Sequence, residues 1–431
     1  MRFEELNLSA PLLEAVAQLD FTEMTEIQAQ TIPLLLEGKD VIGKSNTGTG
    51  KTAAFSIPIL EQMEHMEPEE RRNVCALILC PTRELAMQAC DEIRKFSRFQ
   101  KDVHPVAVFG GASMERQIHQ LKTGANLVVG TPGRGLDHLR RRTLKLDNLK
   151  TIVLDEADEM LNMGFREDIE AVLSQIPEER QTVLFSATMP REIAELSQTL
   201  LKDPIRVEVT PQSSTVDAIR QKLYRVEQAE KKNLLQEVLR DESLTSVLVF
   251  TNTKHRANRV AELLNGAGIP AMAIHGNKSQ SARVLALSSF KEGTIRALVA
   301  TDIAARGIDV SGLPCVINFE LPNVPETYVH RIGRTGRAGR PGLAISFCNR
   351  EEEAYLRDIE KLIGKKVPVV RNHALPVGET PVKKTPEPKA PETPVRKSIL
   401  AGELSTGQGG QKLRLEPLPP PRAMPPEPPK P

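Results

Sequence analysis

The chain has 431 residues, more than a single hydrophobic core usually serves, so we expect two domains and a further segment. Its composition, 40% hydrophobic and 26% charged, is that of an ordinary globular protein. No apolar run approaches the roughly 18 residues of a membrane-spanning helix, and the N-terminal residues lack a signal-peptide core. We therefore expect neither a membrane protein nor a secreted one. The formal net charge is only +1, so positive charge for binding a nucleic acid would have to be concentrated on one part of the surface.

The five cysteines are odd in number and form no C-x-x-C pair. Cys75 and Cys80 lie in an apolar run, where buried free thiols are expected. This pattern fits a reducing compartment, and we expect a cytoplasmic protein.

Short apolar runs alternate with helix-like segments over residues 20–370, which predicts parallel α/β sheets buried on both faces. The polar stretch 209–217 reads as a linker between two such lobes, residues 31–208 and 218–374. Strands are expected at 41–45, 75–81, 106–110, 126–132, 151–158 and 182–188, and then at 246–252, 271–276, 297–302, 315–320 and 343–348.

Residues 375–431 are rich in proline, lysine and glutamate. Such a segment buries too little apolar surface to offset the entropy of ordering it, so we expect a disordered tail. The tail is either passive or a binding segment for a protein partner.

A loop that resembles the phosphate-binding pattern G-x-x-x-x-G-K-[ST] follows the first expected strand, with serine in place of the first glycine. Glycines let backbone N–H groups surround phosphate oxygens, the lysine reaches the β- and γ-phosphates, and the final hydroxyl binds Mg²⁺. An ordinary loop is the alternative, but the strand–loop–helix context favours nucleotide binding. The loop comprises Ser45, Asn46, Thr47, Gly48, Thr49, Gly50, Lys51 and Thr52.

An acidic pair follows the expected strand at 151–154, at the sheet edge where α/β proteins bind ligands. Asp155 is expected to hold Mg²⁺, and Glu156 to polarise the attacking water. An acidic helix N-terminus is the simpler alternative, but it does not account for the phosphate loop upstream. Together the two motifs predict ATP hydrolysis.

With its flanking motifs in order, the string Asp155-Glu156-Ala157-Asp158 resembles the DEAD-box ATP-dependent RNA helicases of superfamily 2, of the bacterial RhlE-like kind. The resemblance covers about residues 3–370. It implies two tandem RecA-like domains, with residues 1–30 as the Q-motif region, 31–208 as the ATP-binding domain and 218–374 as the helicase C-terminal domain. It also implies ATP and Mg²⁺ as cofactors and RNA as partner.

The segment FTEMTEIQ, residues 21–28, resembles the family's Q motif. The resemblance implies that Gln28 hydrogen-bonds adenine and that Phe21 packs near the base. It also implies that Asp309 contacts the ribose.

The resemblance assigns further residues to RNA binding. Hydroxyls, glycine N–H groups and arginines can bind the phosphates of RNA without reading its bases. In the first lobe these are Thr82, Arg83, Gly110, Gly111, Thr131 and Arg134, and in the second Thr251, Gly276, Gln280, Arg283 and Thr301. Ser186 and Thr188 are expected to bond back to the acidic motif, at Asp158, and so to couple hydrolysis to strand separation.

The string HRIGRTGR, residues 330–337, is the most specific part of the resemblance. It implies that Arg334 and Arg337 reach the γ-phosphate, with Arg337 as arginine finger, and that His330 joins the network around the acidic motif. A solvated basic helix end is the alternative.

Because the two lobes hold different parts of the ATPase, we expect RNA that spans both to stimulate hydrolysis. The expected activity is local, non-processive unwinding of short RNA duplexes or remodelling of RNA–protein complexes by a monomer. An ATP-gated RNA clamp with little unwinding remains an alternative. A core with poor turnover is a weaker alternative, suggested by Ser45 and by Asp20, Met24 and Glu26, which stand where the family's Q motif usually has glycine and prolines.

Overall fold

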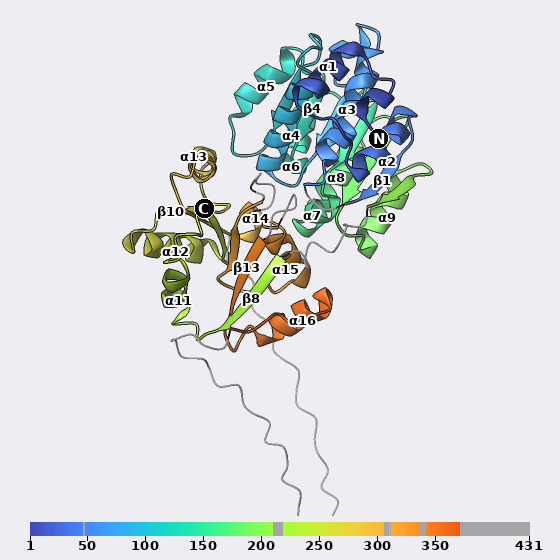
Figure 1. Ribbon diagram of the computed structural model, residues 1–431. Coiled ribbons are helices and arrows are strands. Elements are labelled where there is room, and N and C mark those ends of the chain that lie inside the picture. Colours follow the sequence, from blue (N-terminus) through green and yellow to red (C-terminus); the bar gives the residue numbers. More distant parts are fainter. Residues whose placement is uncertain (46–47, 210–218, 306–309, 311, 337–341, 371–431) are drawn as a thin grey trace, which may run out of the picture. The chain divides into compact units, whose positions relative to one another are not determined.

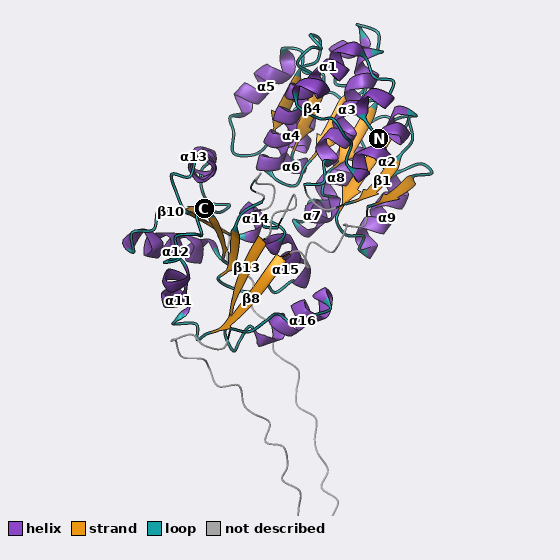
Figure 2. Ribbon diagram, viewed as in Figure 1, coloured by secondary structure: helices purple, strands orange, loops and turns teal. Residues whose placement is uncertain are grey.

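A computed structural model describes residues 1–45, 48–209, 219–305, 310, 312–336 and 342–370. Within them the strands form two sheets, each all parallel (Figures 1 and 2). No helix among the described residues has the length and apolar character needed to cross a membrane. All five cysteines are buried and free, which was predicted for Cys75 and Cys80.

The first sheet has seven strands in the order β3-β4-β2-β5-β6-β1-β7. A separate apolar core covers each of its two faces, so most strand residues are buried whichever face they point to. The strands are β1 Val41–Lys44, β2 Ala76–Leu79, β3 Pro105–Val108, β4 Leu127–Gly130, β5 Thr151–Leu154, β6 Gln181–Ser186 and β7 Ile205–Glu208.

One face of this sheet packs on helices from the first hundred residues, and the other on helices from later in the lobe. The first group is η1 Phe3–Glu5, α1 Ala10–Gln18, α2 Glu26–Leu36, α3 Lys51–Glu64 and α4 Arg83–Phe96. The others are η2 Glu70–Arg72, α5 Met114–Lys122, α6 Pro132–Arg140, α7 Ala157–Asn162, α8 Arg166–Leu173 and α9 Arg191–Leu200.

The second sheet has six strands in the order β10-β11-β9-β12-β13-β8. Its strands are β8 Ile219–Arg225, β9 Val247–Phe250, β10 Ala271–Ile274, β11 Ala297–Ala300, β12 Cys315–Asn318 and β13 Gly342–Cys348. Its helices are α11 Lys231–Val238, α12 Lys254–Gly266, α13 Gln280–Lys291, α14 Asp302–Ala305, α15 Pro325–Ile332 and α16 Glu353–Ile363.

The eleven predicted strands are all present, but β7 and β8 were not predicted. Both are edge strands with exposed or half-buried polar positions, so they lack the continuous apolar run that marked the others. The expected linker 209–217 lies outside the described residues except for Val209, and the tail 375–431 lies wholly outside them.

The topology brings the predicted nucleotide motifs to one edge of the first sheet. Strands β5, β6 and β1 are neighbours in register, with Thr151 opposite Gln181 and Val41 opposite Val183. Since parallel strands end at the same edge, the loops after these three strands must lie side by side. The phosphate loop follows β1, the acidic motif follows β5, and the Ser186–Thr188 segment lies at the end of β6.

Candidate active site

The phosphate loop connects β1 to α3 in the left-handed backbone conformation that glycine allows. Gly48 has φ 82°, and Gly50, which caps α3, has φ 94°. Ser45, which replaces the usual glycine, is buried and donates its N–H to the Ser186 carbonyl at 3.0 Å. Its hydroxyl lies 2.5 Å from that of Thr49. Thr52 is half-buried in the first turn of α3, while Asn46 and Thr47 lie outside the described residues.

Gln28 fixes the start of α2 to the phosphate loop. Its Oε1 accepts a hydrogen bond from the Thr25 N–H at 2.9 Å, and its Nε2 donates to the Gly50 carbonyl at 3.1 Å. A Cβ on Gly50 would lie 2.4 Å from this Nε2, so the close approach requires glycine there independently of φ. The side chain is buried, and its predicted contact with adenine stays a prediction.

Phe21 presents an aromatic ring at the surface just before α2. It is 36% exposed and packs edge-to-face against Phe3 and Phe96, with ring centroids 6.1 and 5.6 Å away. The buried rings hold Phe21 in place while part of it stays accessible. This arrangement suits the predicted packing against a base, which remains a prediction.

Lys51 and the acidic pair form a buried charge cluster under the phosphate loop. The Lys51 Nζ lies 3.7 Å from Asp155 Oδ1 and 3.9 Å from Glu156 Oε1, too far for hydrogen bonds. Burial lowers the pKa of Lys51, but the charges of Asp155, Glu156 and Asp158 outweigh it, so the pKa is raised and the lysine is charged.

Two atoms of this cluster lack hydrogen-bond partners among the described residues: the Lys51 Nζ and the Asp155 Oδ1. Burial, helped by repulsion from Glu156, raises the pKa of Asp155 to about 6, although Lys51 opposes the shift. Buried polar atoms are rarely left unpaired in folded proteins. A phosphate beside the lysine and a cation beside the carboxylate would satisfy both, so the donor set fits ATP and Mg²⁺.

Glu156 adopts a strained backbone conformation directly after the metal-binding candidate. Its φ of 53° lies in the left-handed region, which non-glycine residues seldom occupy and which costs on the order of 1–2 kcal/mol. It precedes the first residue of α7. Such strain often occurs at functional sites, where contacts with the surrounding structure hold the backbone in an unfavourable conformation.

Asp158 is tied to the segment after β6. Its Oδ2 accepts hydrogen bonds from the Thr188 N–H at 2.9 Å and from the Thr188 hydroxyl at 2.8 Å. The Ser186 hydroxyl instead donates to the Thr188 carbonyl at 2.6 Å. The sequence assigned both hydroxyls to the acidic motif, but only that of Thr188 contacts it directly. Ser186 acts on the conformation of the segment.

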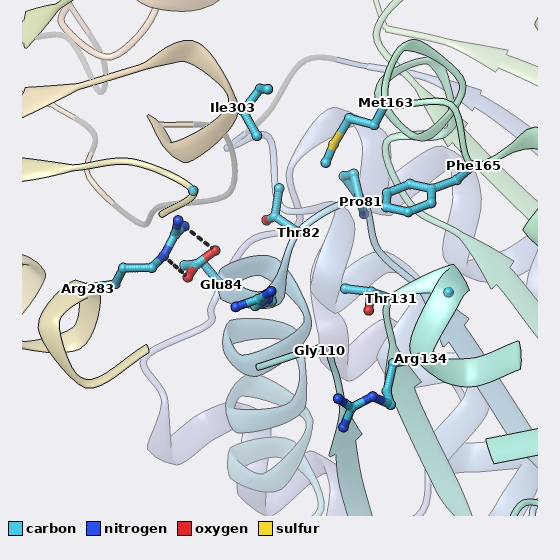
Figure 3. A pocket seen from close by; sticks show the side chains of 13 residues that line it. Pro81, Thr82, Glu84, Gly110, Thr131, Arg134, Met163, Phe165, Arg283 and Ile303 are labelled. Carbon is cyan, nitrogen blue, oxygen red and sulfur yellow. Dashed lines mark hydrogen bonds and ion pairs between the residues drawn. The ribbon is translucent and has the colours of Figure 1, made fainter. Parts of the chain in front are cut away.

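Seven of the eleven predicted RNA residues, from both lobes, line one cleft of about 380 Å³ (Figure 3), whereas Gly111, Thr251, Gln280 and Thr301 are not among its lining residues. Thr82 caps α4 by accepting the Leu85 N–H at 3.3 Å. The residues of the prediction that line the cleft are Thr82, Arg83, Gly110, Thr131, Arg134, Gly276 and Arg283.

Arg83, the first residue of α4, lies against the glycine pair that follows β3. Gly111 has φ 81°, and a Cβ there would lie 2.2 Å from an Arg83 guanidinium nitrogen. Burial, followed by the charge of Arg283, lowers the pKa of Arg83, which marks a concentration of positive charge. Arg134 is anchored nearby by hydrogen bonds to the Ala112 carbonyl at 3.3 Å and to Gln117 at 3.2 Å.

Arg283 is already engaged by an acid that the sequence did not single out. Its guanidinium makes two contacts of 2.7 Å with the Glu84 carboxylate, and both side chains are buried. The Gln280 Nε2 lies 3.4 Å from the same carboxylate. Glu84 belongs to the string PTRELA that carries Thr82 and Arg83, so its place in the motif was the only available signal.

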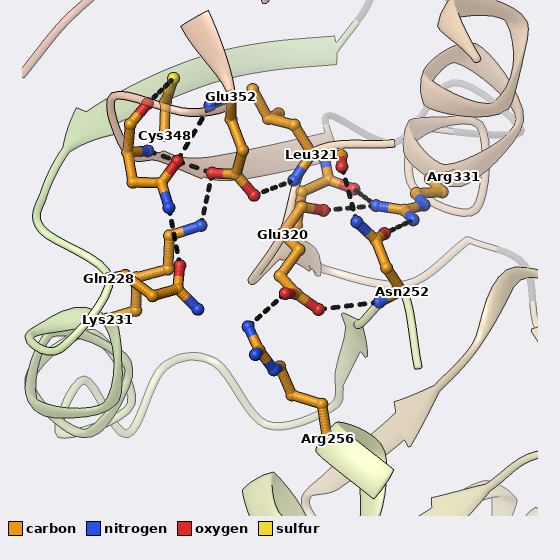
Figure 4. A network of polar contacts seen from close by, with 11 residues as sticks. Gln228, Lys231, Asn252, Arg256, Glu320, Leu321, Arg331, Cys348 and Glu352 are labelled. Carbon is orange, nitrogen blue, oxygen red and sulfur yellow. Dashed lines mark hydrogen bonds and ion pairs between the residues drawn. The ribbon is translucent and has the colours of Figure 1, made fainter. Parts of the chain in front are cut away.

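In the second lobe the buried Arg331 joins the segments that carry Thr251 and Thr301, and Figure 4 shows its contact with the first of them, at Asn252. Arg331 donates two hydrogen bonds to Asp302, which follows Thr301, with Nη2–Oδ2 at 2.7 Å. It also donates to the Asn252 side chain at 2.9 Å, next to Thr251. Arg331 lies inside the HRIGRTGR string, but no role was predicted for it.

The other members of that string lie beside this network. His330 and Arg334 line a small hollow together with Asp302 and Arg331, and Arg334 is buried. Arg337 and Asp309 lie outside the described residues, so their predicted nucleotide contacts stay predictions.

Models of two protein families match the chain: DEAD/DEAH box helicase over residues 25–196 and helicase conserved C-terminal domain over residues 230–339. The chain is 47% identical to the DEAD-box ATP-dependent RNA helicase CshA of Bacillus subtilis, over 86% of this chain and 74% of that protein. It is 48% identical to CshA of Geobacillus kaustophilus, over 85% of this chain and 77% of that protein.

Solved structures agree with these matches. S. cerevisiae Dbp5 bound to RNA and ADP BeF3 is 32% identical, with a TM-score of 0.76 over 86% of this chain and 95% of that one. Mss116p bound to single-stranded RNA and AMP-PNP is 26% identical, with a TM-score of 0.77 over 86% of this chain and 79% of that one. The expected tandem RecA-like fold is confirmed, while the RhlE-like kind stays a prediction. The chain belongs to the DEAD/DEAH box helicase family.

Proposed function

We propose that this chain is a motor that couples RNA-stimulated ATP hydrolysis to local, non-processive unwinding of short RNA duplexes or to remodelling of RNA–protein complexes. Its family membership makes it an ATP-dependent RNA helicase and hence an ATPase. The observation that carries the proposal is the buried Lys51–Asp155 pair, whose facing polar atoms have no hydrogen-bond partner among the described residues.

The nucleotide site is assigned from this geometry. Lys51 would neutralise the β- and γ-phosphates, and backbone N–H groups near Gly48 and Gly50 would surround them. Thr52 and Asp155 would hold Mg²⁺, which neutralises charge on the phosphates when bound. Glu156 would orient and polarise the attacking water.

Coupling is assigned to contacts that join the ATP motifs to the RNA residues. Thr188 bonds to Asp158 two residues beyond Glu156, so a change at the hydrolysis site reaches the segment after β6. In the second lobe, Arg331 links the Thr251 and Thr301 segments to the helix that bears His330. RNA bound at those segments would therefore bias the position of α15, which leads into Arg334 and Arg337.

RNA is gripped through its backbone in this proposal. The cleft offers hydroxyls, glycine N–H groups and arginines, which bind phosphates without selecting bases. The solved relatives Dbp5 and Mss116p were determined with RNA, which supports the same partner here. Binding should weaken steeply with salt and show little sequence preference.

The test is the ATPase rate with and without a structured RNA, for the wild-type protein and for Glu156→Gln. Strong stimulation by RNA that disappears in Glu156→Gln would support the proposal. Turnover indifferent to RNA, or a Glu156→Gln protein as fast as wild type, would refute it. Nucleotide affinity should stay near wild type in Glu156→Gln, because Lys51 and the phosphate loop are untouched.

A further inference from the structure

The first two turns of α12 carry a concentration of positive charge that the cleft does not use. Lys254, His255, Arg256 and Arg259 lie within six residues, and the only acid in the helix is Glu262. Lys254, His255 and Arg259 are exposed, and Lys278, on the segment after β10, is half-buried. We call Lys254, His255, Arg259 and Lys278 the α12 basic face.

Arg256 does not belong to this face, because it holds the helix in place. Its guanidinium pairs with Glu320, whose other oxygen accepts the Asn252 N–H at 2.9 Å (Figure 4). Thr253 caps the helix by accepting the Arg256 N–H at 3.3 Å. The basic face therefore begins on a fixed turn directly after Thr251, a proposed RNA contact.

The two parts of the basic face are joined by a buried histidine. The His275 Nε2 lies 3.0 Å from the Asn258 Oδ1 on α12, which places the end of β10 against this helix. Burial lowers the pKa of His275, and Lys278, Arg283, Lys254 and His255 lower it further. The basic groups of both segments therefore lie close enough to His275 to influence its charge, and His275 directly precedes Gly276 of the cleft.

None of the four residues of the basic face makes an ion pair with any residue that the structure describes. Some surface cations elsewhere on the chain do have an acid within reach, as in Arg141–Asp137 and Arg166–Glu170. Unpaired, closely spaced cations attract a polyanion and release its counterions on binding.

We infer that the α12 basic face binds the backbone phosphates of an RNA strand that continues beyond the cleft. The inference rests on the proposed function, since it extends the same RNA past Thr251 and Gly276. Exposed ammonium and guanidinium groups on a helix surface bind phosphates without reading bases. The basic face would thus add affinity for long RNA without adding sequence preference.

The test compares Lys254→Gln/Arg259→Gln with Arg357→Gln/Lys361→Gln on α16, which removes the same charge from exposed positions in the same lobe. Fluorescence anisotropy, with a non-hydrolysable ATP analogue, gives the Kd for RNAs of about 6 and about 20 nucleotides. We expect the α12 variant to lose about tenfold in affinity for the long RNA and nothing for the short one, while the α16 variant matches wild type. The slope of log K against log salt for the long RNA should become shallower by about 1.4, since each lost contact removes about 0.7 for a single strand.

Two results would overturn the inference: an unchanged affinity for the long RNA, or equal losses for the short and long RNAs. Stimulation of the wild-type ATPase by the short RNA tests the proposed function separately. If the short RNA stimulates but the long RNA gains nothing from the basic face, the proposed function stands and the inference fails.

Discussion

Replacing Gly111 with alanine tests how the Arg83 guanidinium is held in the cleft. Gly111 has φ 81°, where an L-residue costs roughly 1–2 kcal/mol, offset by about 0.4–1 kcal/mol of lost unfolded-state entropy. We therefore expect the free energy of unfolding to fall by about 1 kcal/mol. The added Cβ would lie 2.2 Å from an Arg83 nitrogen, so the guanidinium must move by about 1 Å or more to restore van der Waals contact.

That displacement is easy for a long side chain but removes Arg83 from the position in which we propose that it binds RNA. A hydrogen bond to a charged group contributes about 1.5–3 kcal/mol, so RNA affinity should fall by at least about tenfold. Gly38→Ala is the matched control: its φ is 76° in the same lobe, and nothing lies within 4 Å of the added Cβ. Both variants should lose similar stability in urea denaturation, but only Gly111→Ala should lose RNA affinity.

The assay is RNA binding by anisotropy together with the RNA-stimulated ATPase rate. ATP affinity without RNA should be the same for both variants, because neither glycine touches the phosphate loop. If Gly111→Ala binds RNA as tightly as Gly38→Ala, then Arg83 either tolerates the displacement or does not bind RNA, and the reasoning is refuted.

Three further outcomes follow from the nucleotide site and from a buried ion pair. Gln28→Ala removes the hydrogen bonds to Thr25 and to Gly50, so the free energy of unfolding measured in urea should fall by about 1–2 kcal/mol. The KM for ATP should rise as well, and an unchanged KM would contradict the proposed role of Gln28. The pKa of Asp155 is raised to about 6, so the carboxylate that we propose to bind Mg²⁺ is present above that pH and is lost as the pH falls. The Mg²⁺ concentration needed for half-maximal ATPase should therefore rise about tenfold per pH unit below 6, and a flat profile from pH 7 to 5 would exclude this ligand. Lys231 and Glu352 form an ion pair with almost no solvent exposure, so Lys231→Met should cost about 3–5 kcal/mol in urea denaturation. Lys231→Met with Glu352→Gln should recover part of this loss, because the amide removes the unpaired charge while its oxygen still accepts a backbone N–H.

Most of the fold followed from the sequence because its strands are continuous apolar runs between helical segments. The placement of the loop 45–52 and of the acidic motif at strand ends followed as well, since each comes directly after an apolar run. The strands β7 and β8 did not follow, because edge strands expose one side and carry alternating polar residues. Their apolar content is too low to separate them from a linker.

The partners of the site residues were the part that the sequence could not supply. The pairing of Arg283 with Glu84 joins residues 199 positions apart, and nothing in either local segment marks the other. Arg331 stood inside a recognised string, yet its bonds to Asp302 and Asn252 depend on how β9, β11 and α15 pack together. Residue types indicate the chemistry that is available, but a single sequence does not show which groups are already engaged.

The close approach of Arg83 to Gly111 has a consequence for how relatives of this chain can diverge. A side chain at position 111 displaces the guanidinium of an arginine at position 83, so where that arginine must keep its place the two positions should change together across an alignment. Where position 83 is smaller, position 111 becomes open to asparagine or aspartate, which tolerate a positive φ better than other residues. Gly50 and Gln28 are linked in the same way. In a relative without the glutamine, position 50 would no longer need to be small, but its φ of 94° would still favour glycine.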